Sequence, residues 1–188
     1  MLKDIMFNKR GAMEMSIGTI VVIVLSMSML IFGMILLKNI FTGAGDVVDM
    51  TNEQIKSQVG KLFGEDKKLV VFPDTRRIEV KQGDISGFGI GIKNLLQGAS
   101  EDKFSYEVVV SDPDVKVKCG VSESEILGWI TIGRAESNIA LGPGEFTSGR
   151  VLLRIPEGSS LCDFRLRVNV KHGSNAYASE FMDVTIKA

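Results

Sequence analysis

Residues 15–37 read MSIGTIVVIVLSMSMLIFGMILL and contain no charged side chain. A helix needs about 20 apolar residues to cross a hydrocarbon core about 30 Å thick, and this run is long enough. It therefore predicts a transmembrane helix, which we place at residues 15–41. Before it lies a basic segment, 1–14, and after it a longer part of mixed composition.

The basic residues beside this run predict its orientation. Lys3, Lys9 and Arg10 precede it, whereas Lys38 is the one close basic residue after it. Because basic flanks stay in the cytoplasm, we expect a single-pass protein of the cell membrane whose C-terminal domain is extracellular. A cleaved secretory signal fits less well, because its apolar core has about 7–15 residues and ends at a small-residue cleavage site.

The residues that lead into the helix, KRGAMEMSIGTIV, form a more specific pattern. It resembles the class III signal peptides of archaeal type IV pilins and archaellins. The resemblance implies a membrane leader peptidase that recognises Lys9 and Arg10 and cuts after Gly11. Ala12 would then be the new N-terminus, and the helix would form a filament core. An acidic residue falls at the third mature position here, not at the fifth as in the bacterial branch. An uncut anchor with a basic tail has the same features.

Thr19, Ser26 and Gly33 are spaced by seven and place small side chains along one face of the helix. Small residues let membrane helices approach closely, so this stripe predicts self-association through the helix. Small residues are also common in any membrane helix, which is the simpler interpretation.

A second helix and then a series of strands follow. Residues 51–54, TNEQ, have the form of a capping box at the start of a juxtamembrane stalk helix within 42–66. This helix could pack on the following domain or continue the membrane helix. From residue 67 the apolar pattern has period two, and turn residues divide it. The predicted strands are Leu69–Phe72, Arg77–Lys81, 87–93, 104–111, Val115–Cys119, 129–132, 150–155, 164–171 and 182–187.

The order of motifs within residues 76–188 resembles the immunoglobulin-like modules of prokaryotic surface proteins. The matching stretches are IEVKQG at 78–83, FGIGIKN at 88–94, LGPGE at 141–145, VLLRIP at 151–156 and CDFRLRVNV at 162–170. Many short strands with regular turns also indicate a β-sandwich. The predicted fold is thus an N-terminal transmembrane α-helix followed by an all-β, immunoglobulin-like antiparallel sandwich at 67–188.

Cys119 and Cys162 both fall in the predicted extracellular domain. An even number of cysteines outside the cell favours a disulfide. It would close a loop of about 43 residues and stabilise the fold by about 4 kcal/mol. Two separate buried thiols are the alternative.

The sequence offers little for catalysis, metals or nucleic acid. The net charge of −1 gives no basic surface for nucleic acid. His172 is the only histidine, and we expect it to be exposed in a turn. Gly87-x-Gly89-x-Gly91 is typical of a strand and lacks the spacing of a phosphate loop. Asp112-Pro113-Asp114 indicates a turn rather than a calcium site. Trp129 is expected in the core, with a glycan contact as the alternative. We expect no catalytic residue, no metal and no cofactor.

Three functions remain open. The first is a non-enzymatic surface protein, a pilin-like subunit of a type IV pilus-like filament with the β-sandwich as exposed head. The alternative is a single-pass anchored immunoglobulin-like binding module for adhesion or surface-protein recognition, neither cleaved nor part of a filament. An enzyme such as a hydrolase is a distant third.

Overall fold

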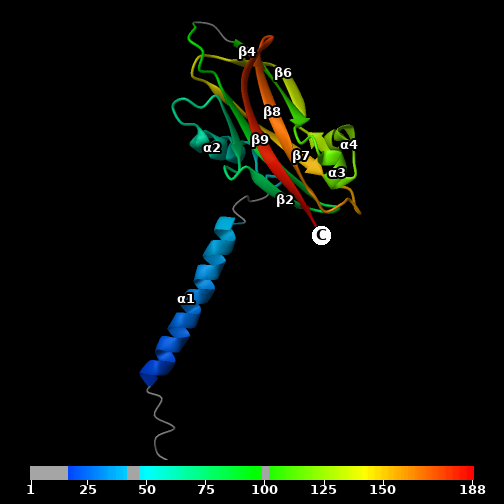
Figure 1. The fold of residues 1–188 in the computed structure, drawn as a ribbon. Coiled ribbons are helices and arrows are strands. Elements are labelled where there is room, and N and C mark those ends of the chain that lie inside the picture. Colours follow the sequence, from blue (N-terminus) through cyan, green and yellow to red (C-terminus); the bar gives the residue numbers. More distant parts are fainter. Residues whose placement is uncertain (1–16, 42–46, 99–101) are drawn as a thin grey trace, which may run out of the picture. The chain divides into compact units, whose positions relative to one another are not determined.

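The computed structural model describes residues 17–41, 47–98 and 102–188. The chain separates into two compact units, Met1–Gly43 and Ala44–Ala188. One helix is described in the first unit, and the second unit is a mostly β domain with three helices (Figure 1).

Helix α1, Ile17–Phe41, covers residues 17–37 of the uncharged run. Within it, Gly18–Ile35 has a mean hydropathy of 2.4, and none of it is buried. The hydroxyls of Ser26 and Ser28 donate to the carbonyls of Val22 and Val24, each at 2.8 Å, so both are satisfied within the helix. By length and composition, α1 is a candidate membrane anchor or signal sequence.

The β domain has two sheets. Sheet 1 has the strand order β1-β3-β7-β5, and sheet 2 has the order β2-β9-β8-β4-β6. The elements are α2 Asn52–Leu62, β1 Leu69–Phe72, β2 Arg77–Lys81, β3 Ile85–Lys93, β4 Asp102–Val110, α3 Val115–Cys119, α4 Glu123–Trp129, β5 Ile130–Ile132, β6 Ala135–Leu141, β7 Phe146–Arg154, β8 Asp163–His172 and β9 Asn175–Lys187. All neighbours pair antiparallel except β2 and β9, which pair in parallel. The predicted all-antiparallel arrangement was therefore wrong at this edge.

Both sheets contribute to one hydrophobic core. Strand β8 shows how the sequence produces it, because its side chains alternate between the core and solvent. Phe164, Leu166, Val168 and Val170 are at most 2% exposed, whereas the residues between them face outward. Apolar residues at every second position thus bury one face of sheet 2 and leave the other face polar.

Two polar side chains link the end of β3 in sheet 1 to strands of sheet 2. Asn94 is fully buried, and its Nδ2 donates to the Leu141 carbonyl of β6 at 2.9 Å. The Tyr177 hydroxyl of β9 donates to the Lys93 carbonyl at 2.8 Å and accepts from the Leu95 amide at 2.9 Å. These bonds fix the two sheets to each other at this end.

Helix α2 packs on the outer face of sheet 1. Its capping box is confirmed: the Thr51 hydroxyl accepts from the Gln54 amide, and the Gln54 side chain accepts from the Thr51 amide. Ile55 and Val59 are buried with Val70 of β1 in a second, smaller core. The stalk helix thus packs on the domain, one of the two arrangements left open. It ends at Leu62 with Phe63 as C-cap.

Glycines of β3 make room for α2. A Cβ placed on Gly91 would lie 2.1 Å from Val59 Cγ1 and 2.9 Å from the Phe63 ring. One placed on Gly89 would lie 3.3 Å from Ile55 Cγ2. The GxGxG pattern is a strand, as predicted, and its bare face receives the helix.

The segment from Val115 to Cys119 is helix α3, not the predicted strand. Val115 and Cys119 are buried at 1% and 2% exposure, whereas Val117 is 88% exposed. In a strand all three would share a face, but in a helix only residues four apart do. Gly120, with φ of 72°, caps the helix in the left-handed conformation.

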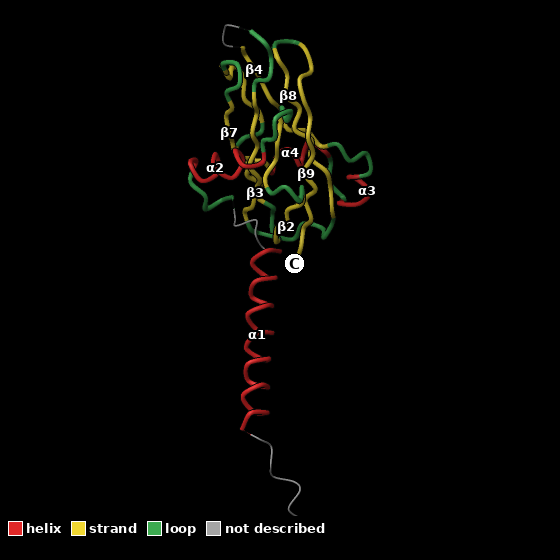
Figure 2. Tube along the Cα trace, turned by 90° about the vertical axis from the view of Figure 1, so that its left-hand side faces the viewer, coloured by secondary structure: helices red, strands yellow, loops and turns green. Residues whose placement is uncertain are grey.

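Helix α4 was also missed. Ser122 and Glu125 form a second capping box, and the helix continues to Trp129, so strand β5 begins only at Ile130. Strand β6, Ala135–Leu141, was not predicted either. The domain is therefore mostly β, with helices α3 and α4 inserted between β4 and β5. Figures 1 and 2 both show α2 on one side of the domain and α3 on the other.

Substitution of Gly91 by Ala should destabilise the domain, by about 1–3 kcal/mol, because the new methyl group overlaps Val59. The matched control is Gly128→Ala in α4, where a Cβ meets nothing within 4 Å. Alanine favours helix, so this change should stabilise the domain by about 0.5–1 kcal/mol. Urea unfolding followed by circular dichroism measures both. Equal free energies of unfolding for the two variants would contradict the close packing of α2 against Gly91.

Candidate functional site

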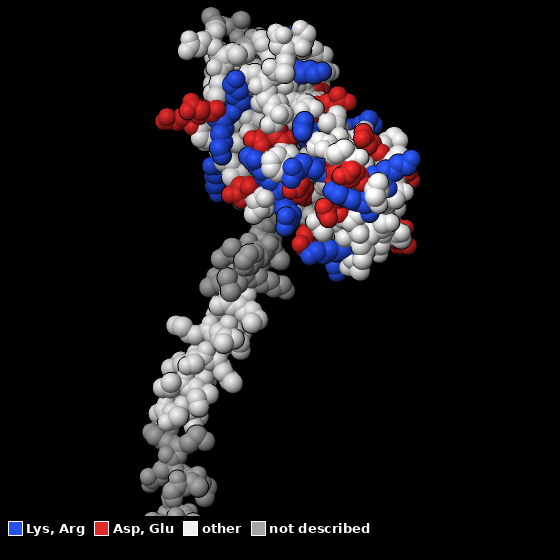
Figure 3. Space-filling view, in the orientation of Figure 1, with Lys and Arg blue, Asp and Glu red and all other residues white. Residues whose placement is uncertain are grey.

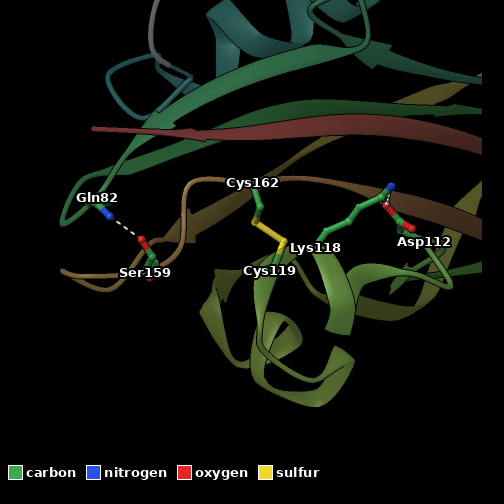
Figure 4. The surroundings of a disulfide bond; sticks show 6 residues. All are labelled: Gln82, Asp112, Lys118, Cys119, Ser159 and Cys162. Atoms are coloured by element: carbon green, nitrogen blue, oxygen red, sulfur yellow. Dashed lines mark hydrogen bonds and ion pairs between the residues drawn. A yellow bond between two sulfur atoms is a disulfide. The ribbon is translucent and has the colours of Figure 1, made fainter.

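A disulfide joins Cys119 at the end of α3 to Cys162 immediately before β8 (Figure 4). Their Cα atoms are 5.4 Å apart, and 43 positions separate them in sequence. Nearby, the Gln82 side-chain amide donates to the Ser159 carbonyl. The inserted helix α3 is thus fixed to the first residues of a central strand of sheet 2.

A hollow of about 570 Å³ lies on the outer face of sheet 2, next to this disulfide. Its floor comes from β2, β9 and β8, and its wall from the end of β4, the following turn and α3. The lining residues are Arg77, Ser111, Asp112, Pro113, Lys118, Asp163, Phe164, Arg165, Asp183 and Thr185. Six of them carry charge, with three of each sign, so the hollow is polar and close to neutral overall.

Strand register explains how residues distant in sequence meet in the floor. Asp183 of β9 lies opposite Arg77 of β2 on one side and opposite Arg165 of β8 on the other. Two residues further along the strands, Asp163 of β8 lies opposite Thr185 of β9 on the same face. Figure 3 shows this mixture of positive and negative side chains on the face that carries β8 and β9 in Figure 1.

Two ion pairs hold four of these charges. Arg165 binds Asp183 through two hydrogen bonds, Nε to Oδ1 at 2.7 Å and Nη2 to Oδ2 at 3.1 Å. Lys118 donates to Asp112 Oδ2 at 2.8 Å. The Asp112 side chain is only 10% exposed, whereas Lys118 is 43% exposed. Ion pairs therefore hold charged side chains in both the wall and the floor of the hollow.

These contacts shift the ionisation of the residues that make them. The Lys118 ammonium lowers the pKa of the Asp112 carboxyl, and the Asp114 amide adds to this. The same bond raises the pKa of Lys118, and pairing with Asp183 raises the pKa of Arg165. Because the folded pKa of Asp112 is depressed, its pairing stabilises the fold at neutral pH and is lost as acid protonates it.

Other features of this face are a buried hydroxyl and an aromatic ring. The Ser111 hydroxyl is buried and has no hydrogen-bond partner among the described residues. The Phe181 ring contacts two guanidinium groups, with its centroid 4.3 Å from Cζ of Arg165 and 5.1 Å from Cζ of Arg76. Stacking on the ring restricts Arg165 in addition to its ion pair.

The predicted processing residues, Lys9, Arg10, Gly11 and Ala12, lie outside the described residues. Thr19, Ser26 and Gly33 lie on α1. A Cβ on Gly33 would meet nothing within 4 Å.

Other predicted positions turned out as follows. His172 is the last residue of β8, and its ring is 5.3 Å from that of Phe104. The expectation of an exposed turn histidine was therefore wrong, because the turn begins one residue later. Trp129 packs its ring against Phe164 at 6.1 Å, at the edge of the core. The Asp112 carboxylate accepts from the Asp114 amide at 3.0 Å, which makes the predicted turn.

Two further observations concern chemistry. No group of three or more His, Cys, Asp or Glu side chains in the described ranges is arranged to hold a metal ion. Burial, together with the charge of Glu136, raises the pKa of Tyr106 to about 12, so this phenol stays neutral.

Sequence reasoning missed the hollow. Its floor residues lie at positions 77, 163, 165, 183 and 185, and only the register of β2, β8 and β9 brings them together. The one signal in the sequence is the regular placement of charge between apolar residues in RLRV at 165–168 and DVTI at 183–186.

No protein-family model matches the chain, and no curated protein matches it. Among solved structures, it is similar to the CARDB domain of a Pyrococcus furiosus protein, in complex with di-metal ions. Identity is 15%, the TM-score is 0.40, and the match covers 63% of this chain and 87% of that one.

Two other similar structures are enzymes of which only a small part is matched. A β-glucosidase from Listeria innocua is 16% identical, with a TM-score of 0.36, covering 64% of this chain but 16% of the enzyme. A family 123 glycoside hydrolase from Clostridium perfringens is 10% identical, with a TM-score of 0.37, covering 59% and 22%. None of these values assigns the chain to a family.

Removal of the disulfide should destabilise the domain by about 4 kcal/mol, the loop-closure entropy for 43 residues. Cys119→Ser with Cys162→Ser tests this by thermal unfolding against the oxidised parent, whose intact mass should be two hydrogens lower than after reduction. The control is reduction of the double variant, which should change nothing. Equal stability of parent and double variant would show that the bond does not hold α3 in place.

Proposed function

We propose that this protein is a single-pass, membrane-anchored cell-surface module, with α1 in the bilayer and the β domain outside as a binding module. The surface of α1 carries this proposal. Thirteen large apolar side chains of α1 are between 47% and 80% exposed, and they occupy all sides of the helix. Such a helix needs an apolar environment around it.

The energy involved is large. Full burial of one such side chain contributes about 1.5–3 kcal/mol. If all thirteen are even half buried, their burial contributes about 10 kcal/mol or more. This is as large as the free energy of unfolding of a typical domain, about 5–15 kcal/mol. Water is therefore a poor environment for α1, whereas a lipid bilayer satisfies its whole surface.

Two independent features support the orientation. The basic residues of 1–14 favour a cytoplasmic N-terminus. The disulfide favours an oxidising compartment for the domain, because thiols in the cytosol stay reduced. Both support a domain on the outer side of the membrane.

We assign the domain to an immunoglobulin-like sandwich. Its support is the pair of sheets, with four and five strands, that bury their facing side chains in one core. The charged outer face of sheet 2, with its hollow, supports recognition of a partner. We assign no catalytic step to the domain. Both thiols are in the disulfide, and the His172 ring lies 5.3 Å from that of Phe104, tilted by 41°.

Labelling of intact cells with a membrane-impermeant amine reagent should modify Lys118 and Lys187, whose side chains are 43% and 52% exposed. Lys3 and Lys9 should stay unmodified until the membrane is permeabilised. Peptide mass spectrometry measures both sets in one sample. A cytoplasmic protein of the same cells is the control for leakage.

The opposite result would be labelling of Lys3 or Lys9, but not of Lys118, in intact cells, which would place the domain inside. Release of the labelled domain into the medium, without α1, would identify α1 as a cleaved signal sequence. Either result would overturn the anchored module.

The second candidate is the pilin-like filament subunit, with α1 in the filament core and the domain as its head. It is favoured by the resemblance at residues 9–21 and by the open face around Gly33. Ser26 on the same face bonds to its own helix, so close packing requires no further polar partner. A leader peptidase and self-association through α1 belong to this candidate.

For the filament, native protein should begin at Ala12, and replacement of Arg10 or Gly11 should abolish both processing and assembly. Gly33→Leu should reduce assembly and leave processing intact, because the added side chain separates packed helices. Val24→Leu adds bulk on the opposite face and is the matched control. N-terminal sequencing and sedimentation measure the two steps. Residues 1–11 still attached in native material would exclude the filament.

A further inference from the structure

The six charges around the hollow alternate in sign. The order is Arg77, Asp183 and Arg165 along the floor row, Asp112 and Lys118 on the wall, and then Asp163 in the adjacent row. The ion pairs Arg165–Asp183 and Lys118–Asp112 neutralise the four inner members. In the described parts of the chain, neither Arg77 nor Asp163 makes an ion pair closer than 4 Å. Asp163 also interacts electrostatically with Lys118, without forming an ion pair with it.

Arg77 and Asp163, the two ends of this order, are separated by a distance that a small polar ligand can span. Arg77 lies on β2 and Asp163 on β8, with β9 between the two strands. Arg77 is opposite Asp183 of β9 and Asp163 is opposite Thr185, so the two positions are offset by two residues along the strands. With strands about 4.8 Å apart and about 6.7 Å for two residues along a strand, their Cα atoms are roughly 12 Å apart. The side chains reduce this separation, and Thr185 lies between them in the floor.

We propose that the hollow binds a zwitterionic peptide, its carboxylate on Arg77 and its ammonium on Asp163. The ligand closes the ring of alternating charges, and every charge then has an opposite neighbour. This proposal rests on the proposed function of the β domain as a binding module, but not on the proposed membrane topology.

The charge distribution disfavours the simpler ligand classes. A polyanion that approaches Arg77 meets Asp112, Asp163 and Asp183, and a polycation meets three cationic groups in the same way. An apolar ligand would desolvate the charged walls without pairing them. The pairs Arg165–Asp183 and Lys118–Asp112, and the disulfide behind the wall, fix the hollow in advance, which lowers the entropy lost on binding.

The probe is the capped tripeptide acetyl-Lys-Gly-Glu-amide, whose charges lie about 6.7 Å apart along an extended chain. It is titrated into the full-length, ¹⁵N-labelled protein in detergent micelles. We expect saturable amide shifts confined to residues near Ser111, Asp163 and Thr185. Acetyl-Gln-Gly-Gln-amide should bind roughly tenfold more weakly. The Lys-Gly-Lys and Glu-Gly-Glu peptides, which retain one matching charge, should bind roughly fivefold more weakly.

Uncapped triglycine has the same two charges at its ends. Its binding would also support the proposal and would assign the natural ligand to a free peptide. Preference for the capped peptide would assign it to an internal segment of a partner protein.

Variants at the two ends locate the site. Arg77→Gln and Asp163→Asn should each weaken the zwitterionic peptide roughly fivefold. The matched controls are Lys171→Gln, which removes a positive charge as Arg77→Gln does, and Glu107→Gln, which removes a negative charge as Asp163→Asn does. Both residues lie on sheet 2 away from the hollow, so these changes should leave affinity unchanged. Unaltered spectra and melting temperatures of the unliganded variants confirm that they fold.

Three results would overturn the proposal. They are equal affinity for the neutral and zwitterionic peptides, equal affinity of the end variants and the parent, and no saturable shift with any zwitterion. None of them would change the labelling pattern of intact cells, so failure of the ligand assignment is distinguishable from failure of the anchored module.

Discussion

The alternation of buried and exposed side chains along β8 and β9 is the constraint on which the rest of the β domain depends. Leu166 of β8 and Met182 of β9 are opposite each other and fully buried. Their neighbours in sequence, Arg165 and Asp183, are also opposite each other, but on the outer face. A slip of one residue would move every apolar side chain into water. The hydrophobic core therefore fixes the register, and the register fixes which charges meet outside. The hollow is a consequence of the core in this sense.

Sheet 1 obeys a different constraint, because β3 is buried on both faces. Phe88, Ile90 and Ile92 fill the shared core, and the glycines between them receive α2. The strand could not accept a side chain at Gly91 without displacing Val59. The chain thus covers the apolar outer face of β1 and β3 with its own helix, whereas sheet 2 needs no cover because its outer residues are polar. In the part of the chain that the structure describes, this difference leaves the outer face of sheet 2 without a helix packed on it, unlike sheet 1.

Strands with regular alternation could be predicted from the sequence, and so could the disulfide partners and the capping box at Thr51. The predictions failed where a short sequence pattern is compatible with both a strand and a helix. VKVKC at 115–119 alternates like a strand, yet the same residues make one helical turn with both ends buried. Strand β6 carries no alternation, because it is an edge strand with most of its residues exposed. The hollow could not be predicted, since its members meet only through register and through the insertion of α3.

The choice between anchor and filament depends on the energetics of the N-terminus rather than on α1 itself. The serine hydroxyls of α1 bond to its own carbonyls, so lipid and a bundle of neighbouring helices suit it equally well. Lys3, Lys9 and Arg10 distinguish the two environments. At a membrane they remain in water and cost nothing. In the core of a filament each would cost at least about 2.5 kcal/mol, on the scale for charges at the centre of a membrane helix. Removal of the leader is therefore a physical requirement of the filament, whereas the anchor is more stable with these charges retained, because they hold its cytoplasmic end in place.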